Sequence, residues 1–258
     1  MIFKLQNTNR MKRIVIALGI LVMVIAASIL HAQHAEGVIT YEVRLNMHKG
    51  LPPERQNMKA MIPEFRTYKQ ELFLNAKESL YKTLIEDEEE EESSGGGITM
   101  RFRQPKVETY VNQETEKLIS LQEFFGKTYL INDTLKVSPW KFGTETKTIM
   151  GYECKQAFFT DESRPDRKQD ITAWYTDKIR PFLGPESFGS LPGAVLAVDI
   201  NNAERVIVCK KVEMRPLKKN ELKEPTSGEK VTRAEFRKKM DDQRKEMEKN
   251  GGRMIIRN

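Results

Sequence analysis

The chain has 258 residues and a formal net charge of +6, with two cysteines and three histidines. So few histidines and cysteines argue against a zinc site and against a histidine-containing catalytic triad. The length is sufficient for one domain with a full hydrophobic core.

The first segment has the layout of a secretory signal peptide. Basic residues precede an apolar run from Ile14 to Leu30, and small and polar residues follow it. The alternative is an uncleaved anchor, but the run is short, since about 20 apolar residues are typical of a spanning helix. We expect residues 1–32 to be removed, by cleavage after Ala32 or Ala35. The mature protein is then exported and soluble, in the periplasm, at the outer membrane or secreted.

The charge of the mature chain is small but uneven. Removing residues 1–32 takes away four basic and no acidic side chains, so the formal charge falls from +6 to about +2. From Lys210 onward the chain is basic, and the part before it is acidic. The basic tail predicts peripheral contact with anionic lipid, and a solvated extension is the alternative.

Short segments of alternating apolar and polar residues predict a mainly β protein. We expect a curved antiparallel sheet or a partly closed barrel, in one domain over residues 33–216, with a short inserted helix at residues 54–61. The predicted strands are residues 37–47, 66–75, 78–85, 105–112, 116–124, 126–133, 144–161, 171–179, 191–200 and 205–214.

Residues 86–92 are almost all acidic, and two serines and three glycines follow them. This composition repels itself and predicts a mobile loop. Calcium binding is the alternative, because carboxylates are ligands for hard cations, but the ligand spacing and central glycine of an EF-hand loop are missing.

Residues 217–258 read as a charged tail that contains one helix. Thr232 and Glu235 form a capping-box pattern, and Asn250 with two following glycines supplies a stop. These signals predict a helix over residues 232–249. Its narrow apolar stripe predicts loose packing.

No catalytic, cofactor-binding or metal-binding residue is expected from motifs. The chain lacks phosphate-binding glycine motifs, and GSLPG at residues 189–193 is not a nucleophile elbow. The triplet RFR at residues 101–103 is a weak signal, so nucleic acid is not an expected partner. Carboxylate pairs, such as Asp161 with Glu162 and Asp166 with Asp170, are explained by surface charge.

The two cysteines lie in strand-like segments. Cys154 and Cys209 do not have metal-binding spacing, and in an exported protein they predict one disulfide. Two separate buried thiols are the alternative.

The segment from Ile171 to Asp199 joins an aromatic strand to a turn rich in glycine and proline. Trp174 and Tyr175 are adjacent on a strand, so we expect one to enter the core and the other to face solvent or a groove. Pro192 and Gly193 suit a type II turn, in which the glycine takes a positive φ.

These segments resemble the secreted GLPGLI family of Bacteroidetes, which has no established activity. The opening strand at residues 37–41 and residues 147–157 also carry the resemblance. Two positions depart from the family pattern: Ser190, where glycine is usual, and Ala194, where leucine is usual. A serine at position 190 indicates that the backbone there does not require a positive φ. The resemblance supports an exported location and the fold. The residues that match the family motif are Trp174, Tyr175, Gly184, Pro185, Phe188, Leu191, Pro192 and Gly193.

Three functional hypotheses follow. The first is a non-enzymatic binding scaffold whose curved sheet holds an apolar ligand, a lipid or a segment of a partner protein. The second is an assembly factor that works with an outer-membrane transporter or secretion system through its acidic loop and basic tail. The third is a carboxylate-dependent hydrolase, which requires a deep cleft with two inward acids.

Overall fold

The computed structural model describes residues 36–51, 53–84, 92–95, 98–101, 106–163 and 168–249. The predicted signal peptide and most of the acidic run lie outside these ranges, so export, cleavage and calcium binding stay predictions. Within the described ranges, no helix is both long enough and apolar enough to cross a membrane.

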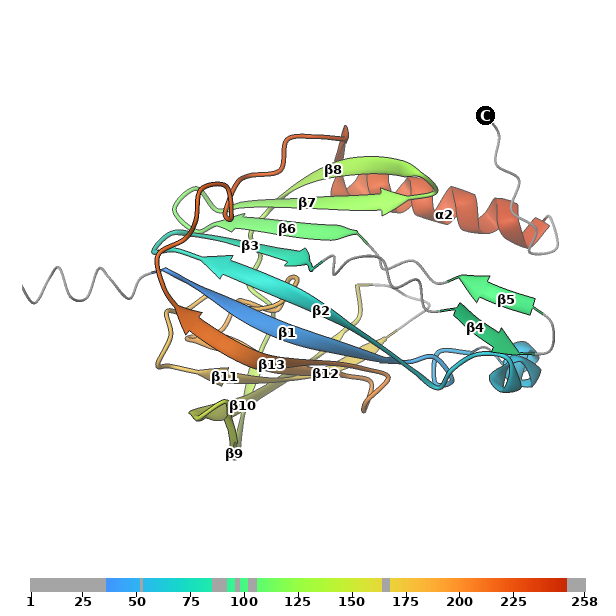
Figure 1. Cartoon of the computed structure of the whole chain (residues 1–258). Coiled ribbons are helices and arrows are strands. Elements are labelled where there is room, and N and C mark those ends of the chain that lie inside the picture. The colour runs from blue at the N-terminus through green and yellow to red at the C-terminus, as the bar shows by residue number, and fades with distance from the viewer. Residues whose placement is uncertain are drawn as a thin grey trace, which may run out of the picture.

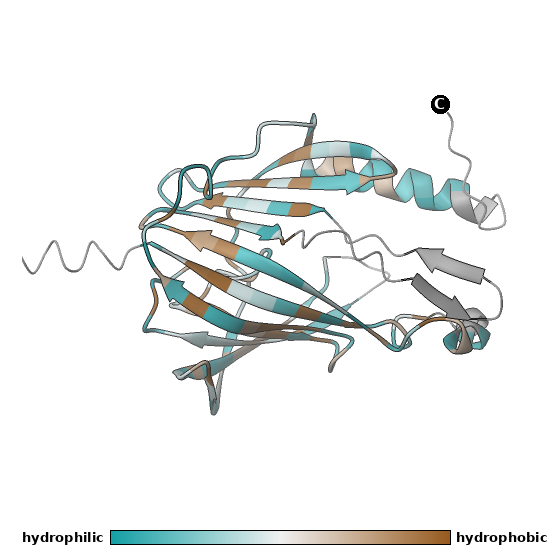
Figure 2. Cartoon of the chain, viewed as in Figure 1, coloured by the Kyte–Doolittle hydropathy of each residue, from teal (hydrophilic) through white to brown (hydrophobic). Residues whose placement is uncertain are grey.

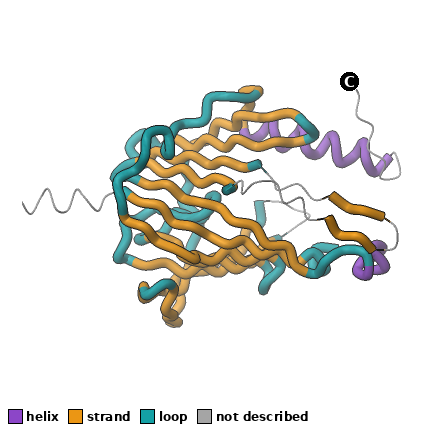
Figure 3. Tube along the Cα trace, viewed as in Figure 1, coloured by secondary structure: helices purple, strands orange, loops and turns teal. Residues whose placement is uncertain are grey.

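Twelve strands form one continuous sheet that bends strongly along its length (Figures 1 and 3). The order is β14-β8-β7-β6-β3-β2-β1-β13-β12-β11-β10-β9, and all neighbours are antiparallel except the parallel pair β14 and β8. The prediction of a mainly β protein with a curved antiparallel sheet is therefore confirmed. The strands are β1 Gly37–Asn46, β2 Phe65–Leu74, β3 Glu78–Thr83, β6 Val107–Asn112, β7 Lys117–Phe124, β8 Lys127–Thr134, β9 Lys141–Ile149, β10 Tyr152–Asp161, β11 Gln169–Thr176, β12 Ala194–Ile200, β13 Arg205–Met214 and β14 Glu229–Thr232.

The central strand β1 supplies side chains to two hydrophobic clusters. Ile39, Tyr41 and Val43 are fully buried in the larger cluster, whereas Val38 belongs to a second one. Successive residues of a strand point to opposite faces, so one alternating segment can serve both cores. Figure 2 shows hydrophobic residues recurring along the strands of the sheet.

Two differences from the predicted elements concern turns. The segment 144–161 is not one strand but the hairpin of β9 and β10, because Met150 and Gly151 both have positive φ and reverse the chain. Within the predicted loop after the acidic run, β4 Glu92–Gly95 pairs with β5 Ile98–Arg101 in a separate two-stranded sheet.

The predicted helices are both present. The 3-10 helix η1 spans Pro53–Ala60, and α2 spans Arg233–Lys249. The capping box is formed: Thr232 N–H donates to Glu235 Oε2 at 2.7 Å, and Glu235 N–H donates to Thr232 Oγ1 at 3.2 Å. These bonds satisfy two N–H groups that the first turn would otherwise leave unpaired.

Helix α2 packs against the sheet mainly through one aromatic side chain. Phe236 is only 3% exposed, and its ring lies 5.3 Å from that of Tyr129 and 5.9 Å from that of Phe124. One aromatic side chain therefore anchors the start of the helix, while most of its other described side chains are exposed, so the prediction of loose packing is confirmed. The domain boundary at residue 216 stays a prediction, although β14 beyond it pairs with β8.

Candidate functional site

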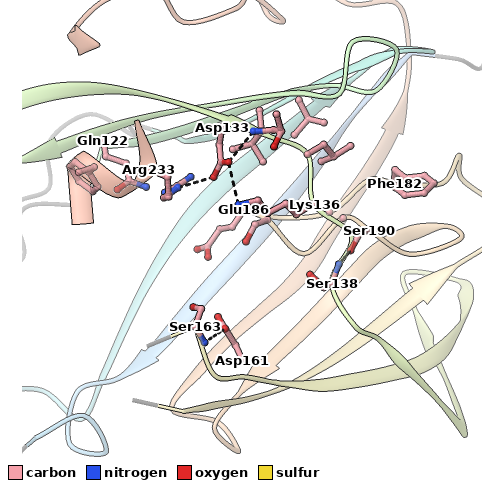
Figure 4. A pocket seen from close by; sticks show the side chains of 18 of the residues that line it. Gln122, Asp133, Lys136, Ser138, Asp161, Ser163, Phe182, Glu186, Ser190 and Arg233 are labelled. Atoms are coloured by element: carbon pink, nitrogen blue, oxygen red, sulfur yellow. Dashed lines mark hydrogen bonds and ion pairs between the residues drawn. The ribbon is translucent and has the colours of Figure 1, made fainter. Parts of the chain in front are cut away.

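A polar cleft lies between the β7–β8 part of the sheet, the start of α2, the end of β10 with Ser163, and the loop that follows β11 (Figure 4). Two adjoining cavities of about 390 and 520 Å³ make it up, and both are lined by Gln122, Asp161, Glu186 and Arg233. A cleft of this size can hold a small ligand or one end of a larger one. Its polar lining suits a ligand that forms many hydrogen bonds.

Asp133 and Arg233 form one side of the cleft. Asp133 is near the end of β8, and its Oδ2 lies 3.2 Å from Arg233 Nε. Arg233 stands in this position because the capping box fixes where α2 begins. Its Nη2 also lies 3.3 Å from Ser120 Oγ.

The surroundings of Asp133 keep its carboxylate ionised. Burial raises the pKa of Asp133, but the hydrogen bonds from the Thr134 N–H and from Arg233, with the charge of Lys136, together lower it below the ordinary value. An ionised carboxylate accepts strong hydrogen bonds from ligand hydroxyl or N–H groups.

Glu186 and Arg205 form a second ion pair in the cleft, with Arg205 Nη2 2.6 Å from Glu186 Oε2. Burial alone would lower the pKa of Arg205, but the charge and hydrogen bond of Glu186 raise it above the ordinary value. Glu186 has a φ of 53°, in the left-handed region that residues other than glycine seldom adopt. Such strained positions cluster at functional sites.

Asp161 faces the cleft from the last position of β10 (Figure 4). Its Oδ1 accepts the Ser163 N–H at 2.8 Å, and it has no cationic partner among the residues that the structure describes. Asp161 thus differs from Asp133 and Glu186, each of which is paired with an arginine. Among the described residues, it is therefore the one of these three carboxylates that forms no ion pair.

The glycine- and proline-rich segment forms the loop that carries Glu186 to the cleft. Gly193 has no positive φ, so the predicted type II turn is wrong. The glycine is needed for space, because a Cβ there would lie 2.0 Å from Thr176 O. Ser190 also has no positive φ, as predicted from the sequence.

The other residues of that motif are divided between the core and the cleft. Tyr175 is buried, while Trp174 is half-buried with Lys147 Nζ 3.9 Å from its ring centroid, as expected for neighbours on opposite faces. Gly184 and Phe188 line the cleft. Pro185 and Leu191 are buried, and Pro192 is exposed.

Cys154 and Cys209 are both buried and both free thiols, so the predicted disulfide is not formed in this structure. They lie in the same hydrophobic cluster, on β10 and β13. The structure therefore has the alternative arrangement, two buried thiols.

The ion-paired residues of the cleft were not recognised in the sequence. Asp133 closes a predicted strand, and Arg233 lies inside the capping box, but neither pattern indicates a site. In the chain, Asp133 and Arg233 are 100 positions apart, so only the folded sheet brings them together. Within the described residues, no group of three or more His, Cys, Asp or Glu side chains is arranged to hold a metal ion.

Comparison with known proteins identifies the family. A family model described as "N-glycanase peptide, N-terminal domain" matches residues 71–237, which is more than half of the chain. The chain belongs to this N-glycanase N-terminal-domain family. The matched residues include nearly all of those that line the cleft.

Solved structures that resemble this chain share its fold at low sequence identity. A structure of PNGF-II in space group P21 has a TM-score of 0.52 at 15% identity, covering 80% of this chain and 33% of that one. PNGF-II in space group C2 has a TM-score of 0.51 at 16% identity, covering 79% and 32%. The chain thus spans about a third of the length of these structures. No curated protein matches the chain.

The family match corrects the sequence-based interpretation. The GLPGLI assignment is wrong, because the family model that matches is that of the N-glycanase N-terminal domain. That assignment was based on short strand and turn motifs. Such motifs are not specific to one family, because close packing alone can require them, as it requires Gly193. The hypotheses of a non-enzymatic scaffold and of an assembly factor are also wrong, because the matching family takes its name from an enzyme.

Proposed function

We propose that this chain acts on N-linked glycans, and that the polar cleft is where the glycan or its attachment point binds and is hydrolysed. Membership of the N-glycanase N-terminal-domain family carries the proposal, because the matched segment supplies almost the whole lining of the cleft. The name of the family, an N-glycanase, gives the substrate class.

The chemistry of the cleft supports a carbohydrate ligand. Sugar hydroxyl groups both donate and accept hydrogen bonds, and paired carboxylate and guanidinium groups offer acceptors and donors side by side. The cleft has two such pairs, Asp133 with Arg233 and Glu186 with Arg205. Gln122 and Gln169 add amide groups that do both.

Hydrolysis adds one water across the bond that is broken. One fragment takes the hydroxyl group and the other takes the proton, so the reaction consumes no oxidant, reductant or cofactor. A positioned carboxylate assists by removing or supplying that proton. Asp161 is the carboxylate proposed for this role, because it lacks a cationic partner among the described residues.

The proposal includes export, because residues 1–32 have the layout of a signal peptide and the basic tail suits peripheral membrane contact. The partner is then a glycoprotein outside the cytoplasm. Sequencing the first residues of the mature protein tests this part, and a mature chain that begins at Met1 or Met11 would contradict it.

The role of Asp161 is tested by measuring glycan release from a glycoprotein that carries one N-linked glycan. Asp161→Asn should lower the rate about 100-fold, the usual contribution of one acid–base group. Glu162→Gln is the matched control, because Glu162 is exposed and pairs with Lys168 at 2.6 Å, and it should leave the rate unchanged. Equal rates for the two variants would refute the assignment.

A further inference from the structure

Ser190 has a hydroxyl group whose two lone pairs are both used within the protein. The Ser138 N–H and the indole N–H of Trp140 each donate to Ser190 Oγ, at 3.0 Å in both cases. A serine hydroxyl has two acceptor lone pairs and one O–H proton. Ser190 can therefore accept nothing further, and its proton is the one hydrogen-bonding group that it has left.

That proton is available to a ligand in the cleft. Ser190 and Ser138 lie together on the cleft wall (Figure 4), and Ser190 is 9% exposed. Among the described residues, none accepts a hydrogen bond from its hydroxyl. Accepting two hydrogen bonds polarises the O–H group and strengthens the bond that it donates.

The two donors hold the hydroxyl in a fixed direction. The Trp140 ring packs edge-on against Phe159 with centroids 4.5 Å apart, and the backbone N–H of Trp140 donates to the backbone carbonyl oxygen of Ser138 at 2.8 Å. Both donors thus come from one short, internally bonded segment. Because both lone pairs of Ser190 Oγ accept hydrogen bonds from these donors, the hydroxyl group can offer a ligand only its proton.

We propose that Ser190 is a specificity-determining residue that donates its O–H to an amide carbonyl oxygen of the ligand. A carbonyl oxygen only accepts, so it matches a group that only donates, whereas a sugar hydroxyl must also direct its own proton to another acceptor. This inference rests on the proposed function, since a glycopeptide has amide carbonyls in its acetamido sugars and in its peptide backbone.

Calorimetric titration of the full chain tests the inference with three ligands. These are N,N′-diacetylchitobiose, the amide-free disaccharide cellobiose, and an unglycosylated Asn-Gly-Thr tripeptide blocked at both ends. We expect one amide-bearing ligand to bind at least tenfold more tightly than cellobiose. Preference for diacetylchitobiose identifies the acetamido source, and preference for the tripeptide identifies the backbone. No preference over cellobiose would overturn the inference.

Variants of Ser190 separate recognition from support of the loop. Ser190→Ala should lower the affinity for the preferred amide ligand about tenfold and leave cellobiose binding unchanged. Ser190→Cys, which keeps a side chain of similar shape with a weak S–H donor, should do the same if the alanine variant does not fold. Ser190→Thr keeps the hydroxyl and should restore the preference. An amide preference that survives in the alanine or cysteine variant would refute the role.

The failure of this inference is distinguishable from that of the proposed function. Glycan release by Ser190→Ala with an unchanged KM would overturn the role of Ser190 and leave the proposed function standing. An amide preference that depends on Ser190, in a wild-type chain that releases no glycan, would support the role and overturn the proposed function.

Discussion

Glu186 and Arg205 join the loop after β11 to the first residue of β13, with 2.6 Å between Oε2 and Nη2. About three quarters of each side chain is buried. The pair holds Glu186 in a left-handed backbone conformation, φ 53°, at the edge of the cleft. The loop is thus positioned by an ion pair as well as by its glycines and prolines.

Replacing Arg205 should destabilise the fold measurably. Arg205→Met leaves the Glu186 carboxylate largely buried without its partner, which should lower the free energy of unfolding by about 2 kcal/mol. Lys210→Met is the control on the same strand, since Lys210 pairs with Glu42 at the surface, and it should cost less than about 1 kcal/mol. Urea denaturation measures both, and equal losses would contradict a structural role for the Glu186 pair.

Gly193 should tolerate no side chain. In Gly193→Ala the new Cβ would lie 2.0 Å from Thr176 O, so the loop or β11 has to move, at a cost of about 3 kcal/mol. Gly50→Ala is the control, because the nearest atom to its Cβ, Glu204 Oε1, is 3.8 Å away. Thermal denaturation compares them, and similar melting temperatures would show that Gly193 is not required for close packing.

The buried thiols predict a loss of stability at alkaline pH. Burial raises the pKa of Cys154 and of Cys209 to about 11 from an ordinary 9.0. The folded chain therefore holds these protons more tightly than the unfolded chain does. The resulting stabilisation is complete below pH 9 and is lost as the pH rises from about 9 to 11.

Unfolding free energies at pH 8 and pH 10 test this prediction in the wild type and in the double variant Cys154→Ala, Cys209→Ala. The upper limit is pH 10 because burial also raises the pKa of Tyr41 from 10.0. Above that pH, the folded chain would lose further stability through Tyr41. The wild type should lose more stability between the two pH values than the double variant. Equal losses, with a mass two hydrogens lighter, would show that the cysteines form the disulfide predicted from the sequence.

The strands could be predicted from the sequence because alternating burial requires alternating residue types. β1 shows this directly, with Ile39 and Val43 on one face and Val38 on the other. The hairpin at Met150 and Gly151 was missed because the alternation continues through the turn, although Gly151 marked the position.

The cleft could not be predicted in the same way. Its ion pairs join segments that are distant in sequence, Asp133 with Arg233 and Glu186 with Arg205, and each residue alone resembles ordinary surface charge. Asp161 was noticed as part of a carboxylate pair, but only the folded sheet turns it toward the cleft. The glycine- and proline-rich turn that ends at Gly193 was informative about packing, because the glycine is needed for space, but it was uninformative about chemistry.

The central proposal is that this chain acts on N-linked glycans, and the mass of a glycoprotein before and after incubation with the purified full chain tests it most directly. The carrier should have a single N-linked glycan. We predict a carrier whose mass falls by that of the released glycan, or of all but its first sugar, less the one water that hydrolysis adds, with a free glycan in the supernatant. A carrier of unchanged mass after prolonged incubation, with no free glycan, would contradict the claim.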